Sequence, residues 1–488
     1  MPNSKTHEET PLQSPIPFSH GSNGEYVPRE HDPRIEQAER RFAEIAERTT
    51  QRLQISRRKF LASASSTTAA LCVLNSVFGC GSPDGSGGNG YNVNPESIED
   101  NDLACDLLQH DTFIFDVQTH HVNPAGPWRD NGRWEAFLNF MPQGACGELD
   151  RVDCYNTSHY IREMFLNSDT TMAVLSALPA DLGENPLEIE DAFATRAIVE
   201  ELSSTERVLL HGLVQPNLGI RELVGMHALA DDYDVKAWKV YTPYGGWRLD
   251  DPNIGLPFLD RARLIGIPII CAHKGLPLNG FNPDFASPDD IGPAASLYPD
   301  LTFVVYHSGY ETDTLEGPYD PDAPNQGVDR LIKSVEDSGL GPGSNVYAEL
   351  GSTWRNLMTR PDEAAHVLGK LLKHLGPERV VWGTDSIWYG SPQDQIDAFL
   401  QFQISPEFQE RFGYPELTMD IKRGILGLNA AEIYDVDPTA QRCAIDGDEI
   451  ASMKRAMDPL ERRTFRQTGP QTRREFLNFL RLRDGMPG

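Results

Sequence analysis

The chain has 488 residues, of which 39% are hydrophobic and 24% charged, so it is rich enough in apolar side chains to fold and is not a disordered protein. Its length predicts one large domain with accessory segments. The formal net charge of −29 disfavours nucleic acid as a partner, because a phosphate backbone is bound by neutralising it with Lys and Arg. We interpret the acidity as a solubilising surface; an acidic cleft that steers cationic substrates is the alternative.

The first 90 residues are predicted to be an export leader with a flexible linker. Arg57 and Arg58 lie in the segment Ser56–Leu61, which resembles the twin-arginine export motif. The moderately apolar stretch that continues to Phe78 resembles the hydrophobic region of such a signal, although it is rich in Ser and Thr. An uncleaved membrane anchor is the alternative. The long segment before the arginines departs from the usual short leader.

Cys80 follows Val77-Phe78-Gly79 in a loose match to a lipobox, so we expect it to be a lipidation site. The Gly- and Ser-rich residues 81–90 follow it as the linker. This predicted leader indicates export by a twin-arginine-like route to the periplasm, or anchoring on the outer side of the inner membrane through the leader or Cys80. Twin-arginine export, in the families that use it, carries folded proteins that often hold a cofactor, which suits a metalloprotein.

From about residue 105 the chain alternates strand-like and helix-like segments, a pattern typical of a parallel sheet with crossover helices. Apolar runs such as Ile267–Ile270 and Leu301–Val305 suit strands that are buried on both faces. We expect eight strands, at residues 113–118, 171–177, 208–215, 236–241, 266–272, 301–306, 345–350 and 379–384. Eight repeats predict an α/β fold, the (β/α)8 TIM barrel, over 105–436. An open doubly wound sheet is the alternative, but no Gly-x-Gly-x-x-Gly turn follows the first strand.

Two connections are too long to be plain loops, and both follow strand ends. Residues 121–160, with several aromatic residues, are expected to form a lid or pocket wall, and residues 274–299 are rich in Pro, Asn and Asp. In an oxidising compartment Cys146 and Cys154 could close a small loop. The tail, 437–488, is expected to contain an amphipathic helix that packs against the barrel or contacts another copy in a homo-oligomer.

Metal-type ligands follow several of the predicted strands directly. They are His120, His273, His307 and Asp385. In a (β/α)8 barrel the carboxyl ends of the strands meet at one mouth, where the catalytic residues gather. Gln118 shares a strand face with His120, because side chains repeat every two residues, whereas His121 should face the other way.

Five motifs in this fixed order resemble the amidohydrolase superfamily. They are Asp116-Val-Gln-Thr-His120, His273, His307-Ser-Gly309, Gly383-Thr-Asp385 and the closing Gly427–Tyr434 segment. The resemblance covers roughly residues 110–436. The nearest branch is the amidohydrolase-related group (amidohydrolase 2), which includes carboxymuconate-semialdehyde decarboxylase-like enzymes and lactonases.

The resemblance implies one divalent metal ion held by His120, His273 and Asp385. His307 would be the acid/base or polarising group beside a metal-bound water, and Asp385 could also take the proton of that water. Gln118 departs from the family pattern, which usually has His there, and an amide oxygen is a harder and weaker ligand than imidazole. We expect zinc, with manganese as the alternative if Gln118 shifts the preference.

Other polar and aromatic residues near strand ends have weaker signals. Lys239, Trp247 and Trp388 are expected to contact the substrate, although Lys239 could also bridge two metals and the tryptophans could be core residues. Glu349 is expected to support the ligands or to be a buried hydrogen-bonded group. His159 and His211 are expected to be structural.

These residues and the resemblance together predict an exported, metal-dependent hydrolase with a small-molecule substrate. The enzyme would cleave a small cyclic ester, an amide or a related bond. Non-oxidative decarboxylation of an aromatic or unsaturated carboxylic acid is the alternative within the same branch. A second alternative is a barrel that lost its metal through Gln118 and serves as a binding protein.

Overall fold

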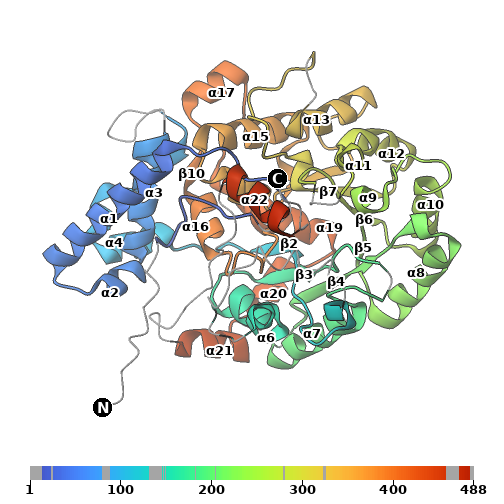
Figure 1. Ribbon diagram of the computed structural model, residues 1–488, viewed down its shortest axis with the longest axis horizontal. Coiled ribbons are helices and arrows are strands. Elements are labelled where there is room, and N and C mark those ends of the chain that lie inside the picture. The colour runs from blue at the N-terminus through green and yellow to red at the C-terminus, as the bar shows by residue number, and fades with distance from the viewer. Residues whose placement is uncertain are drawn as a thin grey trace.

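The computed structural model describes residues 14–22, 26–79, 88–130, 146, 148, 150–181, 183–203, 205–277, 281–322, 326–457 and 472–483. Eight parallel strands form one sheet whose spatial order follows the chain (Figure 1). Their bounds are β2 Phe115–Thr119, β3 Met172–Leu175, β4 Val208–Leu213, β5 Ala237–Val240, β6 Ile269–His273, β7 Thr302–Tyr306, β8 Val346–Glu349 and β9 Val380–Val381.

The sheet curls into a barrel because backbone hydrogen bonds join its first and last strands. Val117 N donates to Trp382 O over 3.0 Å, Asp385 N donates to Gln118 O over 2.9 Å, and His120 N donates to Ser386 O over 2.7 Å. The predicted (β/α)8 barrel is therefore confirmed, and the open doubly wound sheet is excluded.

All eight predicted strands are present, and the differences lie at their ends. The strand predicted from residue 266 begins at Ile269, because Gly266 ends the preceding helix in the left-handed region at φ 86° and Pro268 has no N–H to donate. The last strand is only two residues long, since the chain turns toward the mouth beyond Val381.

Helices cover the outside of the barrel between successive strands, as Figure 1 shows. A representative case is α15 (Pro361–His374), which starts with Pro at its first position and carries acidic residues in its first turn and basic residues in its last turn, as the helix dipole favours. The other helices of this part are α6 Thr157–Ile161, α7 Ile189–Leu202, α8 Ile220–Tyr233, α9 Thr242–Gly245, α10 Gly255–Ile265, α11 Pro283–Ala286, α12 Ile291–Leu297, α13 Gly327–Asp337, α14 Thr353–Leu357, α16 Gln393–Gln401, α17 Pro406–Phe412, α18 Met419–Arg423 and α19 Asn429–Ile433.

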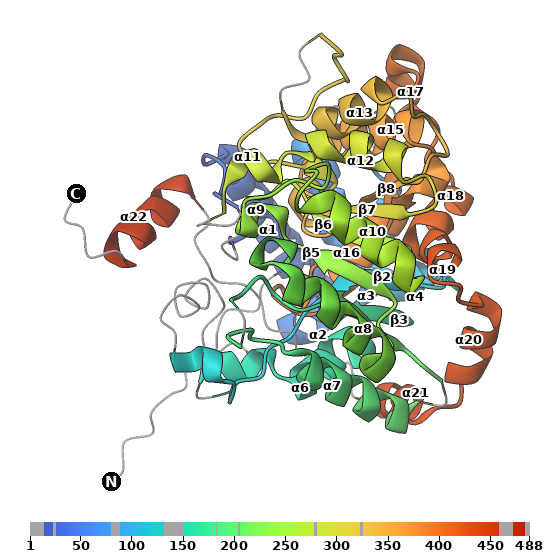
Figure 2. The same ribbon diagram turned by 90° about the vertical axis from the view of Figure 1, so that its right-hand side faces the viewer.

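The two ends of the barrel carry different elements (Figure 2). Helices α9 and α11, which directly follow β5 and β6, lie at the mouth. The tail helices α20 (Pro438–Ile445) and α21 (Glu449–Ala456) lie at the opposite end. The predicted tail helix is α22 (Arg473–Arg483), which begins with a capping box in which Glu475 N donates to Thr472 Oγ1 over 3.2 Å.

The N-terminal region folds beside the barrel rather than standing apart from it. Helices α1 (Pro33–Leu53), α2 (Arg57–Leu61), α3 (Ala64–Phe78) and α4 (Asn101–Leu108) lie next to α16 and β10 (Phe402–Gln403) in Figure 1. Strand β1 (Gly90–Tyr91) pairs antiparallel with β10. Arg57 and Arg58 are exposed. No helix among the described residues has the length and apolar character needed to cross a bilayer.

Two predictions for this region fall beyond what the structure describes. Cys80 and most of the predicted linker, residues 81–87, lie outside the described residues. The disulfide predicted as an option between Cys146 and Cys154 is confirmed.

The closing motif of the sequence, Gly427–Tyr434, packs against the bottom of the barrel. Asn429 Nδ2 donates to Pro377 O over 2.9 Å and to Val380 O over 2.7 Å, which holds the start of β9. A Cβ atom added to Gly427 would lie 2.2 Å from Phe113 O and 3.0 Å from Phe113 C, so only glycine allows this helix to approach the entry to β2.

Substitution of Gly427 by Ala should therefore lower the free energy of unfolding by about 1–3 kcal/mol, because the chain entering β2 must move. A matched control is Gly225→Ala in α8, where nothing lies within 4 Å of the added methyl group. The control should raise the free energy of unfolding by about 0.5–1 kcal/mol, through its higher helix propensity. Urea denaturation of both variants measures the two values, and an unchanged Gly427→Ala midpoint would contradict the packing described here.

Candidate active site

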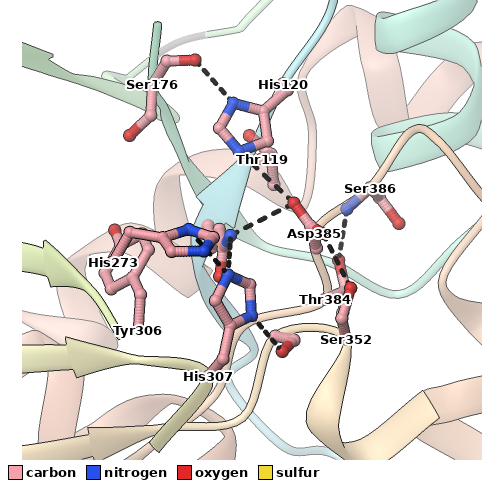
Figure 3. Close-up of polar contacts among 12 residues, drawn as sticks. Thr119, His120, Ser176, His273, Tyr306, His307, Ser352, Thr384, Asp385 and Ser386 are labelled. Carbon is pink, nitrogen blue, oxygen red and sulfur yellow. Dashed lines mark hydrogen bonds and ion pairs between the residues drawn. The ribbon is translucent and has the colours of Figure 1, made fainter. Parts of the chain in front are cut away.

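The side chains predicted to meet at the mouth do meet (Figure 3). His120 Nε2 lies 3.3 Å from Asp385 Oδ1, and His273 Nδ1 lies 3.2 Å from His307 Nε2. Gln118 joins the two pairs, because its Nε2 lies 3.1 Å from Asp385 Oδ1 and 3.4 Å from His307 Nε2. All five side chains are buried.

Each of the three imidazoles is oriented by a backbone carbonyl behind it. His120 Nδ1 lies 2.7 Å from Ser176 O, His307 Nδ1 lies 2.7 Å from Gly351 O, and His273 Nε2 lies 3.1 Å from Leu276 O. A carbonyl only accepts, so these ring nitrogens carry the proton and donate. In the neutral ring the other nitrogen then presents its lone pair to the centre of the cluster.

This arrangement places lone pairs opposite each other. Burial, followed by the nearby His307 and Lys239, lowers the pKa of His273 well below its usual value, so His273 is neutral. Its Nδ1 lone pair faces Nε2 of His307 across 3.2 Å, and Nε2 of His120 lies 3.3 Å from a carboxylate oxygen of Asp385. A cation at the centre would turn the repulsion between the two facing imidazole lone pairs into attraction.

Gln118 has an amide oxygen without a hydrogen-bond partner among the described residues. This Oε1 atom is buried, and a Cβ added to Gly351 would lie only 2.2 Å from it. A buried carbonyl oxygen that accepts no hydrogen bond is costly, and a bound cation is one way to satisfy it.

The donor chemistry of this cluster fits a divalent cation. Imidazole nitrogens, a carboxylate and an amide oxygen are the ligand types of zinc and manganese. Two ligands about 2.0–2.1 Å from a tetrahedral zinc lie about 3.3–3.4 Å apart, close to the separations within the two pairs. The positions of the candidate ligands relative to one another are less favourable for binding a cation. Within the described part of the chain, no group of three or more His, Cys, Asp or Glu side chains is arranged to hold a metal ion. The cluster would have to rearrange on binding, because the Gln118 amide group now donates to Asp385 Oδ1 and would have to turn its oxygen inward.

The backbone at the site is strained. Several residues of the site other than glycine have positive φ values. They include His307 (63°), Ser308 (55°), Ser352 (53°) and Asp385 (61°), each just beyond a strand of the barrel. Such conformations cost on the order of 1–3 kcal/mol each and persist where the surrounding structure holds them. Here they turn the side chains of His307 and Asp385 into the mouth.

Glu349 at the end of β8 holds this strained backbone. Its Oε2 accepts from His307 N over 2.9 Å, its backbone O accepts from Ser308 Oγ over 2.6 Å, and its Oε1 accepts from Gly351 N. Burial raises the pKa of this carboxyl to about 8. The two options predicted for Glu349 coincide, because it is a buried hydrogen-bonded group that supports His307.

Of the residues predicted to contact substrate, Trp388 lies beside the cluster. Its ring stacks on His120 with centroids 5.7 Å apart, and Tyr155 packs on its other side. Lys239 lies deeper, with its Nζ 3.4 Å from the centroid of the Tyr306 ring. Trp247 is 2% exposed and packs edge-on against Phe258, so its predicted contact with substrate stays a prediction.

The three other histidines considered in the sequence have their polar contacts outside the cluster. His121 Nε2 lies 2.8 Å from Thr195 Oγ1, as expected for a side chain on the opposite face of the strand. His211 lies inside the barrel between Ser176 Oγ, at 2.7 Å, and Tyr434 OH, at 2.8 Å. His159 Nε2 lies 3.3 Å from Glu148 Oε1.

Sequence reasoning assigned no role to three residues that organise the site, although Asp116 belongs to one of the family-like motifs. Ser176 provides the carbonyl that orients His120, and Ser352 Oγ donates to Asp385 Oδ2 over 2.7 Å. Asp116 accepts from Thr384 N over 3.1 Å and ties β2 to the segment carrying Asp385. Burial raises the pKa of Asp116 to about 7. Ser352 follows an apolar strand segment, so the rule applied to His and Asp would have found it if extended to hydroxyl residues, whereas the backbone carbonyl of Ser176 carries no sequence signal.

Replacement of Gln118 by His should strengthen zinc binding on the order of tenfold or more, because imidazole nitrogen is the better zinc ligand. Competition with a chromophoric chelator measures the affinity. The control is Gln51→His, which adds an imidazole to an exposed position of α1. Equal zinc affinities for wild type and Gln118→His would show that residue 118 does not face the cation.

Comparison with known proteins gives one family and a set of distant structures. The family model described as Amidohydrolase matches residues 168–436, more than half of the chain. This range includes His273, His307 and Asp385, whereas Gln118 and His120 lie before it. A comparison with curated proteins gave no match.

Among solved structures, an uncharacterised TIM-barrel protein from Bordetella bronchiseptica is 13% identical, with a TM-score of 0.43, and covers 67% of this chain and 98% of its own. A 5-carboxyvanillate decarboxylase from Sphingomonas paucimobilis is 14% identical, with a TM-score of 0.40, over 67% and 100% of the two chains. An amidohydrolase from Mycobacterium avium subsp. paratuberculosis is 13% identical, with a TM-score of 0.38, over 67% and 99%. None of these distant likenesses bears on the reaction.

Proposed function

This chain belongs to the amidohydrolase family, and we propose that it is a hydrolase that cleaves a small cyclic ester, amide or related bond with the help of one divalent metal ion. The observation that carries the proposal is the convergence of three carbonyl-oriented imidazoles, the Gln118 amide group and the Asp385 carboxylate in one buried cluster. Burial of the whole cluster keeps bulk water away and strengthens every charge interaction within it.

The residues that would hold the cation are Gln118, His120, His273 and Asp385. Zinc is the first candidate and manganese the second, because the set mixes imidazole with two oxygen ligands. When bound, such a cation supplies Lewis acidity toward the substrate carbonyl and lowers the pKa of a coordinated water.

In this proposal, His307 and Asp385 move the proton that hydrolysis requires. The Nδ1–H group of His307 donates to Gly351 O, so Nε2 is the atom that can take a proton from the attacking water. Oδ2 of Asp385 accepts from Ser352, which leaves Oδ1 facing His120 and Gln118. The proton then passes to the leaving oxygen or nitrogen as the carbonyl–heteroatom bond breaks, so the water is consumed and no oxidant is needed.

The position of Lys239 favours hydrolysis over decarboxylation. A decarboxylase of an aromatic or unsaturated acid benefits from a cation that binds the substrate carboxylate. The Lys239 ammonium group instead lies over the Tyr306 ring, 3.4 Å from its centroid, and 4.7 Å from the centroid of the Tyr241 ring. These ring contacts hold the ammonium group, so we propose hydrolysis first and keep the carboxylate contact as the alternative.

We also propose that the protein works outside the cytoplasm. The Cys146–Cys154 disulfide suits an oxidising compartment such as the periplasm. Arg57 and Arg58 of the twin-arginine-like motif are exposed to a receptor, whereas Phe60 and Leu61 of the same motif are buried.

Metal analysis and a substrate panel test the proposed function together. Purified protein should hold about one equivalent of zinc or manganese, and His273→Ala should lose it, because one of the ligands is gone. On lactones, cyclic amides, esters and aryl carboxylic acids, hydrolysis should fall by about 10²–10⁴-fold in His307→Ala. His227→Ala, an exposed histidine of α8, is the control for both measurements. Metal-free protein that is inactive on the whole panel would favour the binding-protein alternative, and carbon dioxide release from the aryl acids would favour a decarboxylase.

Export is tested with Arg57→Lys/Arg58→Lys in the full-length chain. If a twin-arginine-like receptor reads the motif, the double variant should stay in the cytoplasm while the wild type reaches the periplasmic or membrane fraction. Immunoblots of fractionated cells measure the distribution. The same distribution for both proteins would rule out this route.

A further inference from the structure

The N-terminal segment of residues 14–32, of which 14–22 and 26–32 are described, crosses the loops that follow β7 and β8; we call it the strap. Arg29 is its anchor. Arg29 Nη1 lies 2.7 Å from each carboxylate oxygen of Glu363, and Nη2 donates to Tyr310 OH over 3.0 Å and to Thr314 O over 2.9 Å. A second contact joins Thr312 Oγ1 to Val27 O over 2.9 Å.

Tyr310 connects this anchor to both histidine loops of the site. Its backbone N donates to His307 O over 2.9 Å, and its backbone O accepts from Leu276 N over 2.8 Å. Leu276 O is the carbonyl that orients His273. Arg29 therefore binds the residue that links the loop carrying His307 to the loop carrying His273.

The strap also reaches the region behind Asp385. Both ring nitrogens of His20 are buried and have no hydrogen-bond partner among the described residues, and the charges of Arg355 and Arg360 act on this ring. The Arg355 guanidinium lies 4.0 Å from the centroid of the Tyr389 ring, and Tyr389 OH lies 2.9 Å from Ser352 Oγ. Ser352 in turn donates to Asp385.

The helices that follow the strap also form hydrogen bonds and packing contacts with the rest of the protein. In α3, Asn75 forms two hydrogen bonds with Tyr91 of β1: its Nδ2 donates to Tyr91 O over 2.8 Å, and its Oδ1 accepts from Tyr91 N over 2.7 Å. Ser65 Oγ donates to Ser97 O over 2.7 Å. Helix α3 packs against α1, α4, β1, α16 and the short helix Pro95–Ile98.

The burial of α3 differs from that expected of a signal helix. Its apolar side chains are covered by protein, and so are its polar residues Ser65, Ser66, Thr67 and Thr68. A membrane-inserting segment would expose apolar side chains to lipid, whereas the apolar side chains of α3 pack against α1, α4, β1 and α16.

We propose that the N-terminal region through α3 is a permanent structural part of this protein, and that Arg29 is a positioning residue that holds the two histidine loops of the mouth. The proposal rests on the proposed function only in calling these loops part of the active site. It means that the chain keeps its leader after export, because removal of residues before Cys80 would take the strap away.

A cut in the linker tests whether the leader stays in place. A site for a specific protease is inserted within residues 80–87 of the full-length chain, and the protein is cleaved after folding. Both fragments should elute together in gel filtration, and protein recovered from the cell envelope should have the mass of the uncleaved chain. Separation of the fragments with the melting temperature of the barrel unchanged, or mature protein that begins near Cys80, would overturn the proposal.

Amide hydrogen exchange tests the positioning role of Arg29. In Arg29→Met, exchange should accelerate at least tenfold in residues 273–277 and 307–314, and stay unchanged in β3 to β5, since only the mouth loops lose their anchor. Arg29→Lys should recover part of the protection, because it keeps the charge but not the paired contacts. The control is Arg52→Met, which removes an exposed leader arginine that pairs with Glu99.

Unchanged exchange in both loops of Arg29→Met would refute the positioning role, and so would acceleration spread evenly over the barrel. Neither experiment uses a substrate. A failure of the proposed function on the substrate panel would therefore leave both results interpretable.

Discussion

Closure of the barrel between β2 and the segment after β9 is the constraint on which the site depends. Residues more than 260 positions apart along the chain meet there, because Asp385 N donates to Gln118 O and His120 N donates to Ser386 O. Asp116 reinforces the contact through Thr384. The same hydrogen bonds that complete the sheet thus bring one carboxylate to the two polar side chains of the first strand.

The fold could be predicted from the sequence because its signals are local and repeat eight times. Buried parallel strands appear as short apolar runs, and the carboxyl ends of such strands converge whatever their separation in the chain. That geometry brings together the strand ends that carry His120, His273, His307 and Asp385. Family resemblance added the ligand roles, which no feature of the individual strands reveals.

Other features of the site depend on backbone conformation and could not be predicted. The left-handed φ values at His307, Ser352 and Asp385 set the direction of the reactive groups, and ordinary residues occupy these positions without a glycine to signal them. The carbonyls of Ser176, Gly351 and Leu276 orient the imidazoles, and a backbone carbonyl carries no sequence signal. Likewise the Ser- and Thr-rich composition of α3 reads as a weak signal segment, whereas in the folded protein these side chains are covered by neighbouring helices.

Under the proposed function, the inward nitrogens of His120 and His273 and one oxygen of Asp385 hold one shared cation. Anomalous X-ray diffraction from crystals grown with zinc, recorded on both sides of the zinc absorption edge, tests this claim most directly. We expect a single strong peak bounded by His120, His273 and Asp385, with Gln118 Oε1 turned toward it. A map without a peak among these residues, in crystals that bind zinc elsewhere on the chain, would contradict the account.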